Sequence, residues 1–312
     1  MNFVAKKIIR NSRSSLKIKD FYRHFSKEKT EMEKRRAEIM AKGLPVKKPI
    51  KNVKHIVLVS SGKGGVGKST AAVNLATALK VVRPEKNVGL LDADIFGPTV
   101  PLMMNLYDTP ELNEKNQMQP LVNYNVKCMS MGFLIEEGAP VIWRGLMVMQ
   151  ALDKLIWQVE WGDTDYLIVD TPPGTGDTHL SLIQNLPISG VVLVTTPQIA
   201  SLKVTKRGGV MYQKLNVPLI GIIENMSSVS CPSCNHEVKL FGSQTESLAK
   251  ELNIKIMESF PLQQDIAGCV EDGTPIVIKD SKSIVANKYR NLANDVIKFL
   301  DSIDKKNEVI KK

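Results

Sequence analysis

The pattern of apolar and polar positions divides most of the chain into short apolar runs and helix-like repeats. Apolar runs typical of buried strands lie at 56–60, 88–92, 126–130, 166–170, 190–195, 218–224 and 255–259. Helix-like spacing occurs at 69–81, 145–159, 178–186, 199–214, 243–252 and 283–300. This alternation predicts an α/β fold with a doubly wound, mostly parallel sheet. One domain over residues 52–301 accounts for it, followed by a tail over 302–312 that frays from Lys305.

A glycine-rich loop separates the first predicted strand from the first predicted helix. Residues 60–70 read Ser-Ser-Gly-Lys-Gly-Gly-Val-Gly-Lys-Ser-Thr. A strand, a glycine loop and a helix in this order form a phosphate-binding loop, because the glycines let backbone N–H groups turn toward phosphate oxygens. Lys68 would reach the β- and γ-phosphates, and Ser69 would bind Mg²⁺. The predicted nucleotide-binding residues here are Gly62, Lys63, Gly64, Gly65, Val66, Gly67, Lys68, Ser69 and Thr70.

Carboxylates stand at the ends of two predicted strands. Asp92 and Asp94 follow the run at 88–92, and Asp170 ends the run at 166–170. The carboxyl ends of parallel strands meet beside such a loop, so these side chains are predicted to lie near the nucleotide. We expect Asp94 to orient the attacking water, Asp92 to support the outer shell of Mg²⁺, and Asp170 to act as a Walker-B-like magnesium residue. A plain turn is the alternative for Asp92 and Asp94.

The positive charge of the chain is concentrated at its N-terminus. Residues 1–54 hold 17 of the 42 Lys/Arg but only 5 of the 32 Asp/Glu, so the remainder is nearly neutral. A neutral body does not predict a nucleic-acid surface. Residues 1–26 are basic, serine-bearing and almost free of acids, which is typical of a mitochondrial transit peptide. A basic tail or a membrane-surface helix is the alternative, and residues 27–51 are predicted to be a charged linker.

Two further residues bear on ligand choice. The chain has no Asn-Lys-x-Asp guanine signature, which favours ATP over GTP. Asn225 follows the run at 218–224, on the nucleotide side, and is predicted to hydrogen-bond the edge of adenine. His179 has no second ligand at helical spacing, so it is interpreted as a packing or surface residue. No apolar run reaches the roughly 18 residues of a membrane-spanning helix, so stable membrane insertion is not expected.

A cysteine pair follows the same strand, at Cys231 and Cys234. Cys-x-x-Cys fits zinc, iron–sulfur or redox chemistry. A zinc or 4Fe–4S site needs about four ligands, and the pair supplies two thiolates. Cys128 and Cys269 stand alone in apolar surroundings and are expected in the core. Two copies meeting at a two-fold axis would complete the set, which favours a homodimer, while a turn with unused cysteines stays open.

These motifs together resemble the Mrp/Nbp-type iron–sulfur P-loop ATPases, most closely their mitochondrial branch, which serves assembly of respiratory complex I. The resemblance covers nearly all of residues 40–300. The matching stretches are 43–45, 62–70, 92–98, 129–133, 143–145, 172–177, 196–198, 224–227 and the Cys-Pro-x-Cys motif. Family members usually carry an acid after Thr-Pro-Gln and another five residues later, whereas this chain has Ile199 and Val204. These departures concern subunit contacts and leave the phosphate and cysteine motifs intact.

The resemblance implies a fold and a function. The loop resembles the deviant Walker A loop of MinD, the arsenite-pump ATPase and nitrogenase iron protein, in which the early lysine, here Lys63, reaches the phosphates of the partner subunit. It further implies a slow ATPase that binds a labile 4Fe–4S cluster between two Cys231/Cys234 pairs. Such a protein would deliver the cluster to apoproteins of the mitochondrial matrix, complex I subunits among them. The alternative is an ATP-switched dimeric chaperone or positioning ATPase with structural zinc at the cysteine pair.

Overall fold

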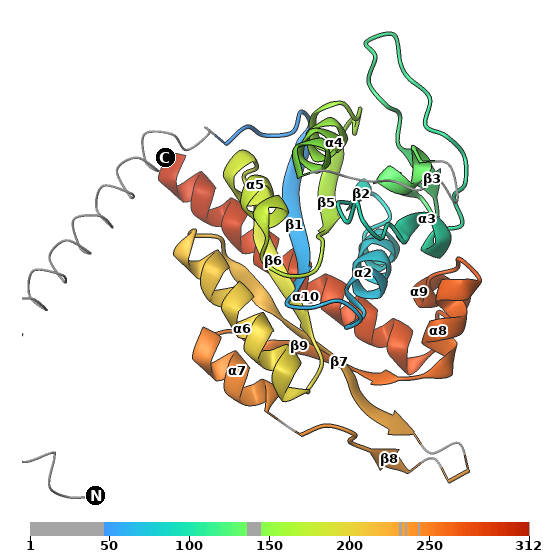
Figure 1. Ribbon diagram of the computed structural model, residues 1–312, viewed down its shortest axis with the longest axis vertical. Coiled ribbons are helices and arrows are strands. Elements are labelled where there is room, and N and C mark those ends of the chain that lie inside the picture. The colour runs from blue at the N-terminus through green and yellow to red at the C-terminus, as the bar shows by residue number, and fades with distance from the viewer. Residues whose placement is uncertain (1–46, 136–144, 231–232, 235, 243, 312) are drawn as a thin grey trace, which may run out of the picture. The chain divides into compact units, whose positions relative to one another are not determined.

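The computed structural model describes residues 47–135, 145–230, 233–234, 236–242 and 244–311, all within the compact unit Lys47–Lys312 (Figure 1). The strands are β1 Val53–Ser61, β2 Val88–Asp92, β3 Leu121–Asn123, β4 Val126–Ser130, β5 Thr164–Asp170, β6 Gly190–Thr195, β7 Leu219–Ser230, β8 Glu237–Val238 and β9 Ile256–Leu262. The helices are α2 Lys68–Val82, α3 Val100–Met103, α4 Gly145–Trp157, α5 Asp177–Asn185, α6 Ile199–Lys214, α7 Thr245–Leu252, α8 Gln264–Glu271, α9 Ile276–Lys279 and α10 Ile284–Lys311, with a 3₁₀ turn η1 at Met131–Phe133.

One sheet runs through the domain. Its strand order is β3-β4-β2-β5-β1-β6-β7-β8, and β9 also pairs with β7. The pairs β3–β4 and β7–β8 are antiparallel, and the other pairs are parallel. The central strands β1, β5 and β6 are buried almost throughout and rich in Val, Ile and Leu, as strands covered on both faces must be. This confirms the predicted mostly parallel α/β sheet.

The helices cover both faces of this sheet. The chain moves from β1 toward β2 through α2, and in the opposite direction from β5 to β6 and on to β7 through α5 and α6. Because such crossovers are right-handed, the change of direction puts α2 on one face and α4 to α7 on the other. The long helix α10 returns to pack along α2 (Figure 1). The direction changes at β1, where the glycine loop leaves the sheet, and ligands of such folds bind at that point.

All seven predicted strands and all six predicted helices are present. The predictions missed β3, β8, α3, α8 and α9, which are short. They were wrong at the C-terminus, because α10 continues to Lys311 and no frayed tail begins at Lys305. Asp304 on this helix bonds Lys54 Nζ at 2.6 Å and His55 Nε2 at 3.3 Å, which anchors it to β1. The predicted transit peptide and most of the predicted linker lie outside the described residues.

None of the described helices is both long and apolar enough to cross a membrane.

Candidate functional site

The glycine loop lies between β1 and α2, as its sequence requires. Gly65 and Gly67 adopt left-handed backbone angles, with φ of 78° and 84°. A Cβ atom on Gly67 would stand 2.1 Å from Asn225 Nδ2, so this position has no room for a side chain. Gly67 directly precedes α2, and the first N–H groups of a helix are free to bind an anion. The backbone is therefore built for a phosphate group at this end of α2.

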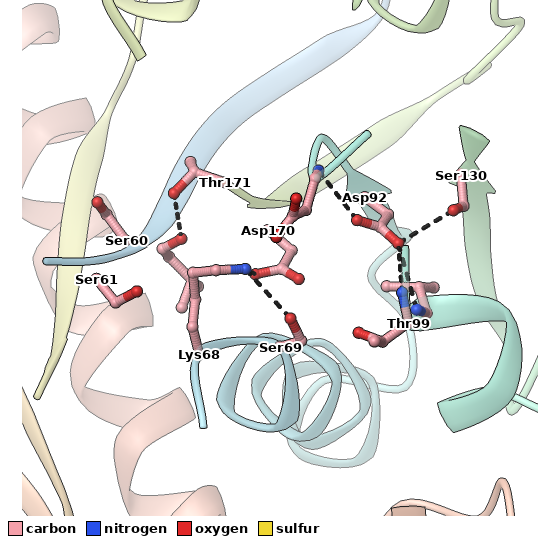
Figure 2. A network of polar contacts seen from close by, with 12 residues as sticks. Ser60, Ser61, Lys68, Ser69, Asp92, Thr99, Ser130, Asp170 and Thr171 are labelled. Carbon is pink, nitrogen blue, oxygen red and sulfur yellow. Dashed lines mark hydrogen bonds and ion pairs between the residues drawn. The ribbon is translucent and has the colours of Figure 1, made fainter. Parts of the chain in front are cut away.

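Lys68 and Asp170 form a buried ion pair behind the loop (Figure 2). Lys68 is 6% exposed and Asp170 is fully buried, and the ammonium group also lies 3.2 Å from Ser69 Oγ. Burial raises the pKa of Asp170, and the Lys68 charge opposes that rise. A buried carboxylate paired with a cation is expected to stay charged, because removing either partner would strand the other charge. The sequence motifs at 60–70 and 166–170 thus meet in one cluster.

This cluster fits a magnesium ion by its donor set. Among the described residues, Asp170 Oδ2 is buried without a hydrogen-bond partner, while Oδ1 faces Lys68. Ser69 supplies a hydroxyl beside the same pair. Carboxylate and hydroxyl oxygens are the ligands that Mg²⁺ prefers. The predicted magnesium residues Ser69 and Asp170 therefore lie together, and their role in binding the ion stays a prediction.

Asp92 lies next to Asp170 in the sheet and holds the loop that follows β2. Its Oδ1 accepts a hydrogen bond from Asp94 N at 3.1 Å, and its Oδ2 accepts from Thr99 N at 3.2 Å (Figure 2). Ser130 Oγ, from the neighbouring strand β4, donates to the same Oδ2 at 3.0 Å. Both carboxylate oxygens are thus engaged by protein groups, so Asp92 fixes the loop at 94–99. Burial and the nearby Asp170 charge raise the pKa of Asp92 to about 7.

A cavity of about 250 Å³ opens between this loop and the glycine loop. It is lined by Ser61, Lys63, Gly64, Gly65, Gly67, Lys68, Ser69, Thr70, Asp94, Gly97, Thr99, Met103 and Pro173. Asp94 is half-buried at its wall, and burial raises the pKa of its carboxyl group. Asp94 thus faces the space where phosphates would lie, as its predicted catalytic role requires.

Lys63 and Asn225 make contacts that the sequence did not predict. Lys63 Nζ donates to Gln198 Oε1 of the same chain at 3.1 Å, so in this structure it is held beside the start of α6. Asn225 Nδ2 donates to Val66 O at 2.9 Å and braces the glycine loop from β7. Its Oδ1 is the atom suited to accept the adenine amino group, and that role stays a prediction.

A buried polar network behind the loop was also missed. His179 Nε2 lies 3.1 Å from Thr171 Oγ1 and 3.3 Å from Ser60 Oγ, and Tyr212 donates to Ser60 Oγ at 3.0 Å. His179 is 1% exposed, which makes it a packing residue and not a surface one. Burial, helped by the Lys68 charge, lowers its pKa to about 4. The only signal in the sequence was its place in the first turn of the helix that follows Asp170.

The cysteine motif joins β7 to β8. Cys234 is exposed and free, whereas Cys231 lies outside the described residues. Cys128 and Cys269 are buried, as predicted for core cysteines. The described residues contain no group of three or more His, Cys, Asp or Glu side chains suited to hold a metal ion.

A second cavity, of about 620 Å³, lies between the cysteine hairpin and the start of α10. Its polar lining includes Glu224, Glu237, Lys239 and Lys288. Ser259 Oγ, on the neighbouring strand β9, donates to Glu224 Oε2 at 2.8 Å. This cavity therefore borders β7 at Glu224, the residue before Asn225.

Comparison with known proteins decides the family. The model of the family described as "ParA: NUBPL iron-transfer P-loop NTPase" matches residues 52–297. The chain belongs to this family. This membership confirms the family resemblance recognised from the sequence motifs.

Two relatives cover most of the chain. The mouse "Iron-sulfur cluster transfer protein NUBPL" is 49% identical over 87% of this chain and 85% of its own length. The Arabidopsis thaliana "Iron-sulfur protein required for NADH dehydrogenase, mitochondrial" is 48% identical over 80% of each chain. Bacterial relatives include the Helicobacter pylori "Iron-sulfur cluster carrier protein", 43% identical over 82% of this chain and 70% of its own.

Solved structures support the fold. A nucleotide-binding protein of Archaeoglobus fulgidus, solved with ADP, is 32% identical, with a TM-score of 0.62, over 72% of this chain and 88% of its own. The cell-division ATPase MinD of Pyrococcus furiosus reaches a TM-score of 0.58 at 20% identity, over 78% and 98%. At 20% identity, the similarity to MinD shows a shared fold and nothing further. The predicted MinD-like P-loop class is thereby confirmed.

Proposed function

We propose that this protein is an ATP-dependent carrier of iron–sulfur clusters. Two copies hold one labile 4Fe–4S cluster between their Cys231 and Cys234 thiolates and pass it to apoproteins in the mitochondrial matrix, complex I subunits among them. Membership of the NUBPL iron-transfer family supports the cargo, and the names of the mouse and Arabidopsis relatives support the class of recipient. The basic, acid-poor residues 1–26 support the location.

The observation that carries this proposal is the course of β7. At Asn225 this strand braces the glycine loop, and it ends at Ser230, directly before the cysteine motif. One strand therefore links the phosphate site to the proposed cluster ligands. Between them, Met226 has a left-handed φ of 55°, and the pairing with β9 shifts register between Asn225 and Val229. Nucleotide binding at the glycine loop would change the backbone at this irregular point of β7 and thereby shift the cysteines that follow the strand.

The residues of the site have defined roles in the proposed ATP step. Lys68 and the N–H groups of the glycine loop hold the β- and γ-phosphates, and Lys63 of one copy would neutralise the phosphates of the other. Ser69 and Asp170 would hold Mg²⁺, supported by Asp92, and this ion would offset the charge of the β- and γ-phosphate oxygens. Asp94 orients water for attack on the γ-phosphorus, which releases ADP and phosphate. Turnover is slow, and it moves the loop at Asp94 and the loop after β5, in which Gly174 has a left-handed φ of 93°.

Anaerobic reconstitution with iron and sulfide tests the cargo. We expect a form lacking residues 1–26 to bind about four iron and four acid-labile sulfide ions per dimer. Replacing both Cys231 and Cys234 by Ser should abolish this binding, because the thiolates are the cluster ligands. Cys269→Ala is the matched control, since that thiol is buried on α8, and it should keep the full iron content.

Two outcomes would contradict the carrier function. One is zinc alone in the wild-type protein, and the other is an unchanged iron content in the double cysteine variant. Either result would favour an ATP-switched dimeric chaperone or positioning ATPase with structural zinc.

A further inference from the structure

Thr99 lines the 250 Å³ cavity, and its buried hydroxyl has no hydrogen-bond partner in the part of the chain that the structure describes. Seven buried polar side-chain atoms lack a hydrogen-bond partner among the described residues: Asn74 Oδ1, Thr99 Oγ1, Trp161 Nε1, Asp170 Oδ2, His179 Nδ1, Thr196 Oγ1 and Thr245 Oγ1. Of their residues, only Thr99 also lines the 250 Å³ cavity. An unpaired buried hydroxyl costs about 1–3 kcal/mol, so such a group calls for a physical reason.

The usual structural role of a threonine at this position does not account for it. Thr99 directly precedes α3, where a threonine hydroxyl commonly caps the helix by accepting a backbone N–H. Here the side chain makes no such bond. The backbone, by contrast, is firmly held, because Thr99 N and Val100 N both donate to Asp92 Oδ2, at 3.2 and 3.3 Å. The chain therefore fixes where Thr99 lies and leaves its hydroxyl uncommitted.

The surroundings of Thr99 show what this hydroxyl would meet. Asp92 joins the loop at 94–99 to Asp170, its neighbour in the sheet register, and Asp170 pairs with Lys68. Lys68 and Ser69 line the same cavity as Thr99, and Figure 2 shows Ser69 below Asp170 and Thr99 below Asp92, on the same side of the two carboxylates. A hydroxyl can donate to a phosphate oxygen, and bonds to charged acceptors are the stronger class.

We propose that Thr99 is a specificity residue that distinguishes nucleoside triphosphate from diphosphate by donating its hydroxyl proton to the terminal phosphate. The Asp94–Thr99 loop thereby closes over a triphosphate and relaxes when the phosphate leaves. This inference rests on the proposed function, since it requires nucleotide in the cavity, and it adds the residue by which the site reads the γ-phosphate.

Calorimetric titration of the full chain with Mg²⁺·ATPγS and with Mg²⁺·ADP tests the inference. Thr99→Val keeps the shape but removes the hydroxyl, and Thr99→Ser keeps the hydroxyl. A lost bond to a charged group weakens binding by about tenfold or more, so Thr99→Val should lose that factor for ATPγS and stay within about twofold of wild type for ADP. Thr99→Ser should restore the preference for ATPγS.

A thermal melt without nucleotide supplies a second readout. Because the hydroxyl has no partner among the described residues, Thr99→Val should melt at or above the wild-type temperature. A clear fall in melting temperature would show that the hydroxyl has a structural role and would overturn the inference. Equal weakening of both nucleotides, or of neither, would overturn it as well.

Failure of the proposed function gives a different result. If the wild-type protein binds neither nucleotide, the ATP-dependent function and the role of Thr99 fall together. If wild type binds both nucleotides and Thr99→Val binds them with an unchanged ratio, only the role of Thr99 falls.

Discussion

At the residue scale, two adjacent carboxylates divide the work of the site. Asp170 pairs with Lys68 and has one oxygen without a hydrogen-bond partner among the described residues, whereas both oxygens of Asp92 accept bonds from the loop at 94–99 or from Ser130. The difference follows from position, since Asp92 lies under that loop and Asp170 lies under the glycine loop. Burial, and after it the charge of the neighbouring Asp170, raise the pKa of Asp92. In the proposed function, a change of charge at the phosphates would reach the loop through these two acids.

The buried His179 gives the stability of the fold a measurable pH dependence. The pKa of His179 is lowered to about 4 by burial and by the Lys68 charge, against 6.5 in an unfolded chain. The unfolded state thus binds more protons between these values, so this residue's contribution is present above pH 6.5 and is lost as pH falls toward 4. Linkage puts the effect at about 3 kcal/mol.

Urea unfolding of wild type and His179→Gln at several pH values measures this contribution. Gln offers an amide near the Nε2 position but does not titrate, so its stability should fall less steeply between pH 6.5 and 4. His55, whose pKa is also lowered, remains in both proteins and cancels in the difference. Parallel stability curves for the two proteins would show that His179 is not held neutral in the fold.

The residue-scale contacts show where sequence reasoning stops. Lys68, Ser69 and Asp170 could be placed together because a glycine loop and strand-ending acids meet at one edge of a parallel sheet. The contacts of Thr99, of Gln198 and of the Ser60–His179–Tyr212 network could not be predicted. They join residues far apart in the sequence, and no local sequence pattern marks such contacts. Asn225 was placed on the right side of the sheet, but its bond to Val66 was not foreseen.

At the element scale, two long elements tie the site to the rest of the domain. The strand β7 links the glycine loop to the cysteine motif, and α10 lies along α2, which begins at Lys68. The longer strands and helices were predictable from their apolar patterns. A strand buried on both faces is apolar throughout, and a helix buried along one stripe is apolar at every third or fourth residue. Of the missed elements, β3, β8, α3 and α9 have two to four residues, too few for a period to appear, whereas α8 has eight and its length does not explain why it was missed.

The last turns of α10 carry a testable part of the fold. Ile303 packs against the core, and Asp304 bonds Lys54 and His55. Ending the chain after Asp301 removes both contacts and should lower the free energy of unfolding by about 1–3 kcal/mol. Ending it after Lys306 keeps both and serves as the matched control. Equal melting temperatures for the two truncated forms would show that these last turns do not anchor the helix.

At the scale of the whole molecule, the distribution of charge and the number of motif cysteines bear on where the protein acts and on whether it needs a second copy. The excess of positive charge lies in residues 1–54, and the rest is nearly neutral, which suits a basic import signal followed by a neutral carrier. The two cysteines of the motif, Cys231 and Cys234, give half of the ligands of a 4Fe–4S cluster. The proposed function therefore needs two copies, and cluster loading and dimer formation should be one event.

Native mass spectrometry of the anaerobically reconstituted protein tests this claim most directly. The account predicts a dimer that carries one cluster of four iron and four sulfide ions, and a cluster-free monomer for Cys234→Ser. A monomer that holds the whole cluster, or a dimer whose cluster survives Cys234→Ser, would contradict it.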